Sequence, residues 1–292
     1  MGWLFRVMSC LPLAFLHALG AGMGWIVFWA SGDYRRRFRA NVAQAGVAWA
    51  DARPAVAAAG RMVAELPWLW YAHKDTPFGA SVQWRNGDLV EQVLAEKRGL
   101  VMLTPHMGSF EVTAQAFAER FMSPELPLTV LYRPARQAAL REVMAGSRER
   151  PGLATAPATL AGVRQMIRAL RRGEVVGLLP DQVPPDGLGV WAPVFGRPAY
   201  TMTLAARLVQ QTGAALLLIW GERLPGGQGF VVHVVRAPEI AKGDSPEAAA
   251  TALNAAMETL IRRAPGQYLW GYHRYKQPRG LDIGAAPDNP AP

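Results

Sequence analysis

A long stretch without charged side chains near the N-terminus sets the strongest limit on how this chain can be organised. No Asp, Glu, Lys or Arg occurs in the 26 residues between Arg6 and Asp33. A helix needs roughly 20 mostly apolar residues to cross the hydrocarbon layer of a bilayer. Trp25 and Trp29 lie near the far end of the stretch, and aromatic side chains favour the membrane interface. The stretch therefore predicts an N-terminal membrane-attached helix that either spans the bilayer or lies in its interface.

Four arginines follow this stretch, at positions 35, 36, 37 and 39, whereas Arg6 alone precedes it. Because basic residues stay on the cytoplasmic side of a membrane, the rest of the chain is expected there. Two other interpretations remain open. A cleaved signal peptide would end its apolar stretch near residues 18–21, and a buried core helix would tolerate the diluting Pro12, Gly20, Gly22 and Gly24.

The remaining composition indicates a folded, basic chain. Of its 292 residues, 51% are hydrophobic and 18% are charged, which excludes a disordered protein. The formal net charge of +9 indicates an anionic partner such as phosphate, an acidic protein or membrane headgroups. A single cysteine, Cys10, excludes an internal disulfide and a CxxC motif. A nucleic-acid partner is not expected, because the arginines are not interleaved with aromatic residues in a recognisable module.

Helical and strand patterns alternate along the chain, which predicts an α/β fold with a mostly parallel central sheet flanked by helices. Helices are expected at residues 54–71, 88–97, 109–121, 137–148, 160–172, 201–212 and 246–263. Strands are expected at residues 99–104, 127–132, 174–179, 214–220 and 230–235. We divide the chain into a membrane segment (1–33), a single α/β domain (34–280) and a flexible tail (281–292).

Several common catalytic motifs do not occur. The sequence contains no GxxxxGK[ST] phosphate loop, no HExxH zinc motif and no GxSxG nucleophile elbow. Of the five histidines, His17 lies inside the apolar stretch, and His233 lies among valines in an expected strand, where a structural role is the better interpretation.

His106 differs from these because it directly follows an expected strand, in the run Thr104-Pro-His-Met-Gly-Ser-Phe-Glu111. Ligands bind at the carboxyl ends of strands in open α/β sheets. His106 and Glu111 can meet only if the histidine lies in a loop and the glutamate in the first helical turn, which Gly108 and Ser109 allow. A carboxylate on one imidazole nitrogen would leave the other as a general base. On spacing alone, a surface histidine beside a helix start remains the alternative.

Several further pieces of sequence occur with the same order and spacing in one family. They are the basic run Arg35 to Asn41, the His106–Glu111 run, Tyr132-Arg-Pro134, an arginine shortly before Gly152, Leu179-Pro-Asp-Gln182, Val194-Phe-Gly-Arg-Pro-Ala199 and Gln267 to Lys276. Together they resemble the bacterial lipid A biosynthesis acyltransferases, the lauroyl and myristoyl transferase family of the H-x4-[DE] lysophospholipid acyltransferase superfamily. Met107 and Phe110 depart from the residues that are common there, which affects the acceptor pocket rather than the chemistry.

The resemblance implies an O-acyltransferase at the bacterial inner membrane, with its catalytic domain on the cytoplasmic face. It implies transfer of a fatty acyl chain from an acyl-carrier-protein thioester to a hydroxyl of a phosphorylated glycolipid, a lipid A precursor. The partners would be acyl carrier protein, that acceptor and membrane lipid. No cofactor is expected besides the acyl-carrier-protein thioester as co-substrate, and no covalent enzyme intermediate is required, because the thioester is already activated. His106 would be the general base and Glu111 would orient it, while backbone N–H groups at the start of the helix that begins at Ser109 are available to stabilise the oxyanion.

Three further residues are candidates for substrate binding. Arg148 matches a functional arginine of the family and suits a phosphate, the alternative being an exposed arginine paired with Glu149. Asp181 lies on the same rim as His106 and would bind a sugar hydroxyl or hold Arg148, the alternative being a turn aspartate. Arg133 is a further phosphate contact. Two other functions stay open: a sister enzyme acting on a lysophospholipid, a glycolipid mannoside or an amino-acid lipid, and a non-catalytic lipid-binding protein.

Overall fold

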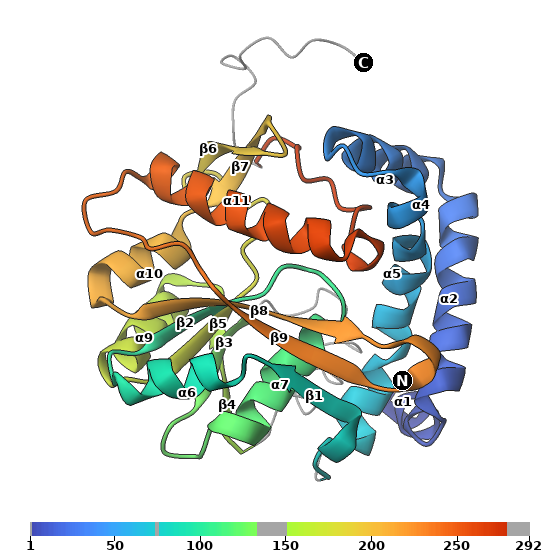
Figure 1. Ribbon diagram of the computed structural model, residues 1–292, viewed down its shortest axis with the longest axis horizontal. Coiled ribbons are helices and arrows are strands. Elements are labelled where there is room, and N and C mark those ends of the chain that lie inside the picture. The colour runs from blue at the N-terminus through green and yellow to red at the C-terminus, as the bar shows by residue number, and fades with distance from the viewer. Residues whose placement is uncertain (1, 74–75, 133–150, 279–292) are drawn as a thin grey trace.

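The computed structural model describes residues 2–73, 76–132 and 151–278 (Figure 1). The α-helices are α1 Gly2–Ser9, α2 Leu13–Ala30, α3 Gly32–Gln44, α4 Trp49–Ala52, α5 Pro54–Ala64, α6 Asp88–Ala95, α7 Phe110–Phe121, α9 Leu160–Arg171, α10 Leu204–Thr212 and α11 Pro246–Arg263. The strands are β1 Val82–Arg85, β2 Leu100–Leu103, β3 Leu128–Tyr132, β4 Leu153–Pro157, β5 Val175–Leu178, β6 Gly189–Val194, β7 Arg197–Met202, β8 Ala215–Arg223 and β9 Phe230–Arg236. The short turns of helix are η1 Trp68–Ala72, which is π-helical, η2 Gly79–Ser81, η3 Pro225–Gly227 and η4 Pro265–Gln267.

The central sheet has seven strands in the order β1-β9-β8-β2-β5-β3-β4. Its neighbouring strands are parallel except β8 and β9, which form an antiparallel pair. Strands β6 and β7 form a separate antiparallel hairpin. The predicted α/β class with a mostly parallel, helix-flanked sheet is therefore confirmed.

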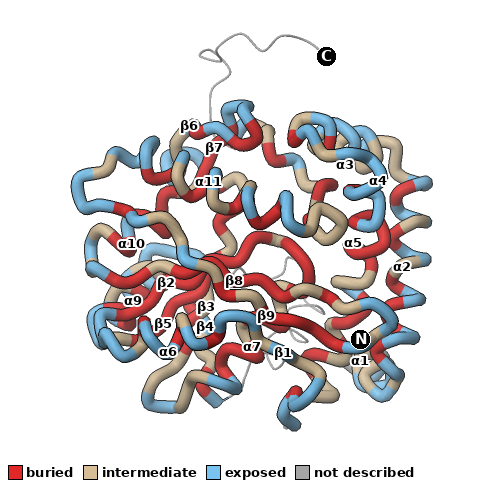
Figure 2. The backbone as a smooth tube through the Cα atoms, in the orientation of Figure 1, coloured by how far each residue is buried: buried red, intermediate tan, exposed pale blue. Residues whose placement is uncertain are grey.

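Both faces of the sheet are buried, and β2 shows why its sequence is a continuous apolar run. Val101 and Leu103 belong to the cluster packed with α9, α10 and α11. Leu100 and Met102 belong to the cluster packed with α6 and α7. Successive side chains of a strand point to opposite faces, so a strand covered on both sides needs apolar residues at every position. Figure 2 shows the buried sheet between more exposed helices.

The N-terminal apolar stretch forms two helices rather than one. Pro12 stands just before α2 and cannot donate a backbone hydrogen bond, and α1 ends at Ser9. By length and composition, α2 is the one helix in the described ranges that is long and apolar enough to cross a membrane. It lies alongside α5 at the edge of the molecule (Figure 1).

The contact between α2 and α5 is close because glycines meet there. A Cβ atom added at Gly60 would lie 1.9 Å from the carbonyl oxygen of Gly20, and one added at Gly24 would lie 2.3 Å from that of Val56. Such distances allow no side chain, so the glycines let the two backbones touch, as small residues do between membrane helices.

Most of the other expected elements appear near their predicted bounds, and the exceptions have local causes. The helix expected at 54–71 ends at Ala64 and is followed by the π-helical turn η1. The helix expected from Thr201 starts at Leu204, because residues 201 and 202 extend β7. The sequence did not indicate β1, β4, β6 or β7. The expected helix at 137–148 and the tail at 281–292 lie outside the described residues, and the division into three parts stays a prediction.

Candidate active site

His106 lies in the loop between β2 and α7, at the carboxyl edge of the parallel strands. β2 and β5 are parallel neighbours, with Leu103 opposite Leu178. His106 and Asp181 each follow their register residue by three positions, so the topology brings them together. The backbone N–H of His106 donates to Asp181 Oδ2 at 2.9 Å, and its ring Nδ1 lies 2.7 Å from Asp181 Oδ1. One carboxylate thus holds both the backbone and the ring of the histidine.

Asp181 is buried and stays charged by virtue of its neighbours. Burial acts to raise the pKa of Asp181, but the attraction and hydrogen bonds of His106, together with the charge of Arg274, lower it below its usual value. The guanidinium of Arg274 is itself buried and donates to Tyr200 O and Thr201 Oγ1, each at 2.8 Å. Asp181 is therefore a stable acceptor for the imidazole.

Tyr268 is also buried close to Asp181 and Arg274. Burial raises the pKa of Tyr268 well above its usual value, and the charge of Asp181 adds to this effect. The phenol therefore remains neutral beside the charged carboxylate.

The second ring nitrogen of His106 faces Gln182. Its Nε2 lies 3.1 Å from Gln182 Nε2, and an amide nitrogen can only donate, so the imidazole accepts there and donates from Nδ1 to Asp181. This is the tautomer that a general base needs, since the lone pair is on the nitrogen opposite the carboxylate. The His106 ring also contacts the edge of the Phe110 ring, with centroids 5.1 Å apart.

Glu111 does not occupy the position that the sequence analysis gave it. The predicted geometry has the Glu111 carboxylate on the imidazole, but in the described structure both nitrogens of His106 have the partners named above. Glu111 lies in the first turn of α7, as expected, and accepts a hydrogen bond from Trp70 Nε1 at 3.3 Å. The carboxylate that contacts the imidazole is that of Asp181, which was predicted as a contact for a sugar hydroxyl or for Arg148. Spacing within the H-x4-E run could not show this, because the partner comes from another strand.

Gly108 gives the loop its shape. Its φ is +57°, and a Cβ atom there would lie 1.9 Å from the carbonyl oxygen of Gly221 in β8. The left-handed conformation and the close approach both require glycine. The N–H of Gly108 donates to Gln267 O, and that of Ser109 donates to Gly221 O, each at 2.8 Å. These two amides already hold the loop, so they are not open to an oxyanion, and donors at the helix start would have to lie after Ser109.

Ser109 precedes α7, as predicted for an N-cap, but its hydroxyl makes no capping hydrogen bond. The side chain is fully buried, and its Oγ is without a hydrogen-bond partner among the residues described. Ser109 therefore fixes the helix start through its backbone rather than its hydroxyl.

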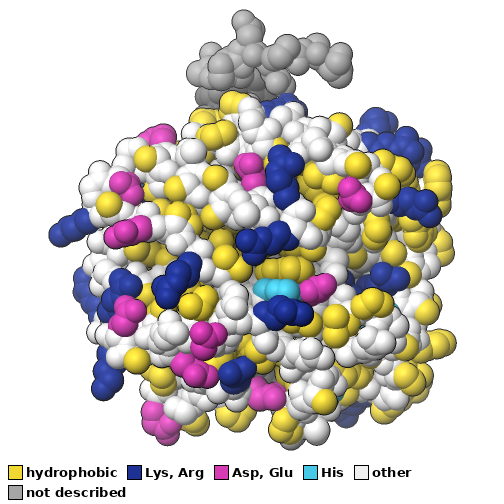
Figure 3. Space-filling model, in the orientation of Figure 1, with side chains coloured by type: hydrophobic (Ala, Val, Ile, Leu, Met, Phe, Trp, Pro, Cys, Tyr) yellow, Lys and Arg dark blue, Asp and Glu magenta, His cyan; other side chains and the backbone are white. Residues whose placement is uncertain are grey.

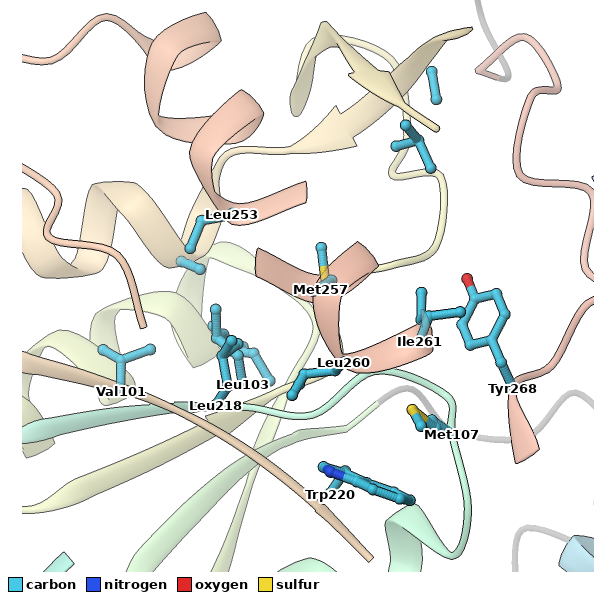
Figure 4. Packing of buried hydrophobic residues seen from close by; sticks show 14 of the residues in the cluster. Val101, Leu103, Met107, Leu218, Trp220, Leu253, Met257, Leu260, Ile261 and Tyr268 are labelled. Atoms are coloured by element: carbon cyan, nitrogen blue, oxygen red, sulfur yellow. The ribbon is translucent and has the colours of Figure 1, made fainter. Parts of the chain in front are cut away.

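Met107 anchors the loop from below. Its side chain is fully buried and lies near Trp220, Leu260, Ile261 and Tyr268 (Figure 4). The residue between His106 and Gly108 thus faces the core under α11.

A buried ion-pair network lies on the other side of the loop. Arg223, at the end of β8, donates to both carboxylate oxygens of Glu65 at 2.7 and 2.6 Å, and its Nη2 also donates to Gly108 O at 3.1 Å. His17 Nε2 lies 3.0 Å from the same carboxylate. Burial acts to raise the pKa of Glu65, but its partners Arg223 and His17 lower it below its usual value. His17, which the sequence placed only in the apolar stretch, is thus a buried partner of Glu65 within the fold.

The remaining candidates are placed as follows. His233 pairs with Glu222 at 2.7 Å and stacks on Trp220, which agrees with the structural role expected for it. Arg133 and Arg148 lie outside the described residues. Within the described ranges, no group of three or more His, Cys, Asp or Glu side chains could hold a metal ion.

Comparisons with known proteins identify the family to which this chain belongs. The family model described as bacterial lipid A biosynthesis acyltransferase matches residues 2–277. The chain is 27% identical over 225 residues to the lipid A biosynthesis lauroyltransferase of Escherichia coli (strain K12), covering 76% of this chain and 70% of that protein. It is 27% identical over 190 residues to the lipid A biosynthesis palmitoleoyltransferase of the same organism, covering 65% and 60%. A lipid A biosynthesis acyltransferase of Haemophilus influenzae is 24% identical over 183 residues, covering 62% and 55%. The chain thus spans less than two thirds of the length of the latter two relatives.

Proposed function

The chain belongs to the bacterial lipid A biosynthesis acyltransferase family, and we propose that it transfers a fatty acyl chain from an acyl-carrier-protein thioester to a hydroxyl of a lipid A precursor. The observation that carries the proposal is the contact of 2.7 Å between His106 Nδ1 and Asp181 Oδ1 at the carboxyl edge of the sheet. The names of the relatives support lipid A as the acceptor. The donor is inferred from the resemblance and from the chemistry below.

In the proposed reaction His106 acts as the general base. Its Nε2 takes the proton of the acceptor hydroxyl while the hydroxyl oxygen attacks the thioester carbonyl carbon. The tetrahedral intermediate collapses with cleavage of the C–S bond, and the imidazolium returns the proton to the leaving thiolate. No covalent enzyme intermediate is needed, because the thioester supplies the activated acyl group.

Asp181 is a positioning residue in this scheme. Its carboxylate holds Nδ1–H and stabilises the imidazolium while the proton is on Nε2. Gln182 occupies Nε2 in the described structure, so the acceptor hydroxyl must displace its amide before transfer. For Glu111 we propose no contact with the imidazole; its carboxylate only supplies a negative charge in the first turn of α7. Arg148 and Arg133 remain proposed contacts for phosphate groups of the acceptor.

The surface of α2 supports a membrane location. Phe15, Leu19, Met23 and Ile26 are exposed, between 43% and 67%, and their spacing places them on one helical face. The opposite face packs on α5, so both sides of α2 are apolar although one of them is on the surface. Figure 3 shows this apolar edge with basic side chains above it, over α3. An apolar face beside arginines suits the acyl–headgroup boundary of a bilayer.

Cation–π pairs mark the same end of α2. The guanidinium of Arg35 lies 6.0 Å from the Trp29 ring, and that of Arg53 lies 5.7 Å from the Trp25 ring. Indole and guanidinium groups both favour the headgroup level. We place the protein at the inner membrane with its α/β domain on the cytoplasmic face.

The test compares His106→Ala with a matched histidine variant. Purified protein is incubated with acyl-carrier-protein thioester and a lipid A precursor, and products are weighed by mass spectrometry. His106→Ala is expected to lose transfer while it still folds and unfolds in one cooperative thermal transition. His233→Ala removes a histidine that is also 2.7 Å from a carboxylate, Glu222, and is expected to keep activity. Equal transfer by His106→Ala and the unmodified chain would overturn the proposed base.

Parallel incubations test the substrates. The same protein is offered acyl-coenzyme A as donor, and a lysophospholipid, a glycolipid mannoside or an amino-acid lipid as acceptor. Preferential acylation of one of these acceptors would overturn lipid A as the substrate while leaving the His106 chemistry in place.

A further inference from the structure

A cavity of about 490 Å³, with a mostly apolar lining into which two arginines are set, lies between α2, α5, the end of β8 and η4. Its lining includes Ala14, His17, Ala18, Arg61, Arg223 and Gln267. His106, Asp181 and Gln182 do not belong to the lining, so the cavity is separate from the reaction centre. At about 30 Å³ per water molecule, it offers far more room than one bridging water.

The charges around this cavity do not balance. Arg61 and Arg223 are both cationic, and Glu65 is the one carboxylate bonded to this group in the described chain. Both oxygens of Glu65 are already engaged by Arg223, and one of them also by His17. One positive charge, that of Arg61, is therefore left over beside the cavity.

Arg61 and Arg223 also have guanidinium N–H groups that make no hydrogen bond within the described residues. Arg223 has a side-chain exposure of 4%, and its Nη1 is buried without a hydrogen-bond partner among the described residues. Arg61 donates from Nε to His17 O at 3.4 Å, and no further hydrogen bond is found for its guanidinium in the described ranges. Buried polar atoms without partners are rare and call for a ligand or water. Burial and, to a smaller extent, the charge of Arg223 lower the pKa of Arg61, whereas the charge of Glu65 acts to raise it.

We propose that this cavity binds a phosphate group, carried by a membrane lipid headgroup or free in solution. Two guanidinium groups with unused donors fit the oxygens of a phosphate monoester. The position of the cavity favours a lipid as the source of the phosphate. Its lining residues Ala14 and Ala18 each directly precede an exposed apolar residue of α2, Phe15 and Leu19. A lipid whose chains cover that apolar face would place its headgroup at the cavity mouth.

The site can be tested without disturbing the catalytic loop. Arg223 holds Gly108 and Glu65, so it is kept intact. The main variant is Arg61→Gln. The matched control is Arg207→Gln, which removes an exposed arginine of α10 that is not part of the cavity lining. A second variant, Ala18→Glu, adds a carboxylate at an exposed lining position and needs no loss of a native contact.

The first measurement titrates inorganic phosphate at constant ionic strength and follows the thermal unfolding temperature, which rises when a ligand binds the folded state. Phosphate affinity is expected to fall at least about tenfold in Arg61→Gln and in Ala18→Glu, because charge-assisted hydrogen bonds are lost or already satisfied. Arg207→Gln should titrate like the unmodified chain. Identical titrations of Ala18→Glu and Arg207→Gln would overturn the site, even if Arg61→Gln failed to fold.

The second measurement identifies the source of the phosphate. Flotation is compared on vesicles of phosphatidylcholine alone and of phosphatidylcholine mixed with phosphatidic acid. A lipid source predicts that the gain from phosphatidic acid falls in Arg61→Gln but not in Arg207→Gln. An equal gain in both, together with a phosphate titration that depends on Arg61, would assign the cavity to free phosphate and overturn the lipid source.

Discussion

The carboxylate of Asp181 holds His106 at two points, its backbone N–H at 2.9 Å and its ring Nδ1 at 2.7 Å. A side chain held in this way has little freedom to rotate, so Nε2 points in a fixed direction. The orientation of the proposed base therefore depends on the junction of two adjacent strands rather than on the helix that follows the histidine.

Asp181→Asn is expected to lower kcat by about 10²- to 10⁴-fold and to lower the thermal stability at neutral pH, because the charged pairing with His106 is lost. The amide can donate to Nδ1 and so favours the tautomer with its lone pair on the wrong nitrogen. Asp186→Asn, an exposed aspartate five residues further along the same loop, is the control and should keep full activity. Steady-state kinetics on both variants measure the difference, and similar kcat values would argue against the role of Asp181.

Glu111→Gln tests, by a measurement other than activity, whether Glu111 or Asp181 orients the His106 ring. If Asp181 alone orients the ring, the ¹⁵N NMR signals of His106 should change in Asp181→Asn and stay close to their original positions in Glu111→Gln. Glu111 bonds Trp70 at 3.3 Å, so its loss should instead move the Trp70 indole signal. A large change in the His106 Nδ1 signal in Glu111→Gln would instead support the Glu111–His106 contact that the H-x4-E spacing predicted.

Gln182→Ala is expected to keep kcat within about tenfold, because the amide only occupies Nε2 until the acceptor hydroxyl replaces it. His106→Ala measured alongside sets the scale of a complete loss. A decrease in Gln182→Ala as large as in His106→Ala would mean that the amide takes part in the transition state.

Two glycines of the N-terminal helix pair should respond in opposite ways to alanine. Gly60→Ala is expected to destabilise the protein by about 1–3 kcal/mol, since its methyl group would meet the backbone of Gly20. Gly22→Ala has open space around the new methyl group and should be neutral or stabilise by up to about 1 kcal/mol through helix propensity. Chemical unfolding in detergent compares them, and equal effects would show that α2 does not pack on α5 as described.

Acid should destabilise the folded chain through Asp181. Its pKa is lowered in the folded state, because the effects of His106 and Arg274 together outweigh burial, so the unfolded chain takes up the proton first as the pH falls. This stabilisation is complete above about pH 4, the usual range for an aspartate, and is lost as the pH drops through the folded-state value. Chemical unfolding from neutral to acid pH should show a shallower decrease for Asp181→Asn than for the unmodified chain. Parallel curves would contradict the pairing.

The sequence predicted the interior strands well and the peripheral ones poorly. β2 and β5 lie in the middle of the sheet, and burial on both faces leaves a continuous apolar run. β1 is a four-residue edge strand with alternating burial, which is too short to show a pattern. In the hairpin, Pro193 lies opposite Pro198, and prolines normally argue against a strand. A two-stranded ribbon tolerates them because each strand has a free edge.

The site was predicted only as far as local spacing reaches. His106 follows a strand that the apolar run identified, so its place on the rim could be inferred. Its partnership with Asp181 depends on β2 and β5 being neighbours, and the order of strands in a sheet is not written in any one segment. The network of Glu65 and Arg223 joins residues 158 positions apart and gave no local signal.

The contact between Gly108 and Gly221 constrains the folding of the loop and does not depend on the chemistry proposed for His106. A side chain at position 108 would collide with the backbone of Gly221. A descendant of this chain that no longer carried out the proposed reaction would therefore still need the glycine in order to fold. The same descendant would be free to replace the neighbouring histidine. Among proteins that share this loop, the glycine is therefore expected to accompany the fold, whereas only the imidazole beside it is expected to accompany the proposed activity.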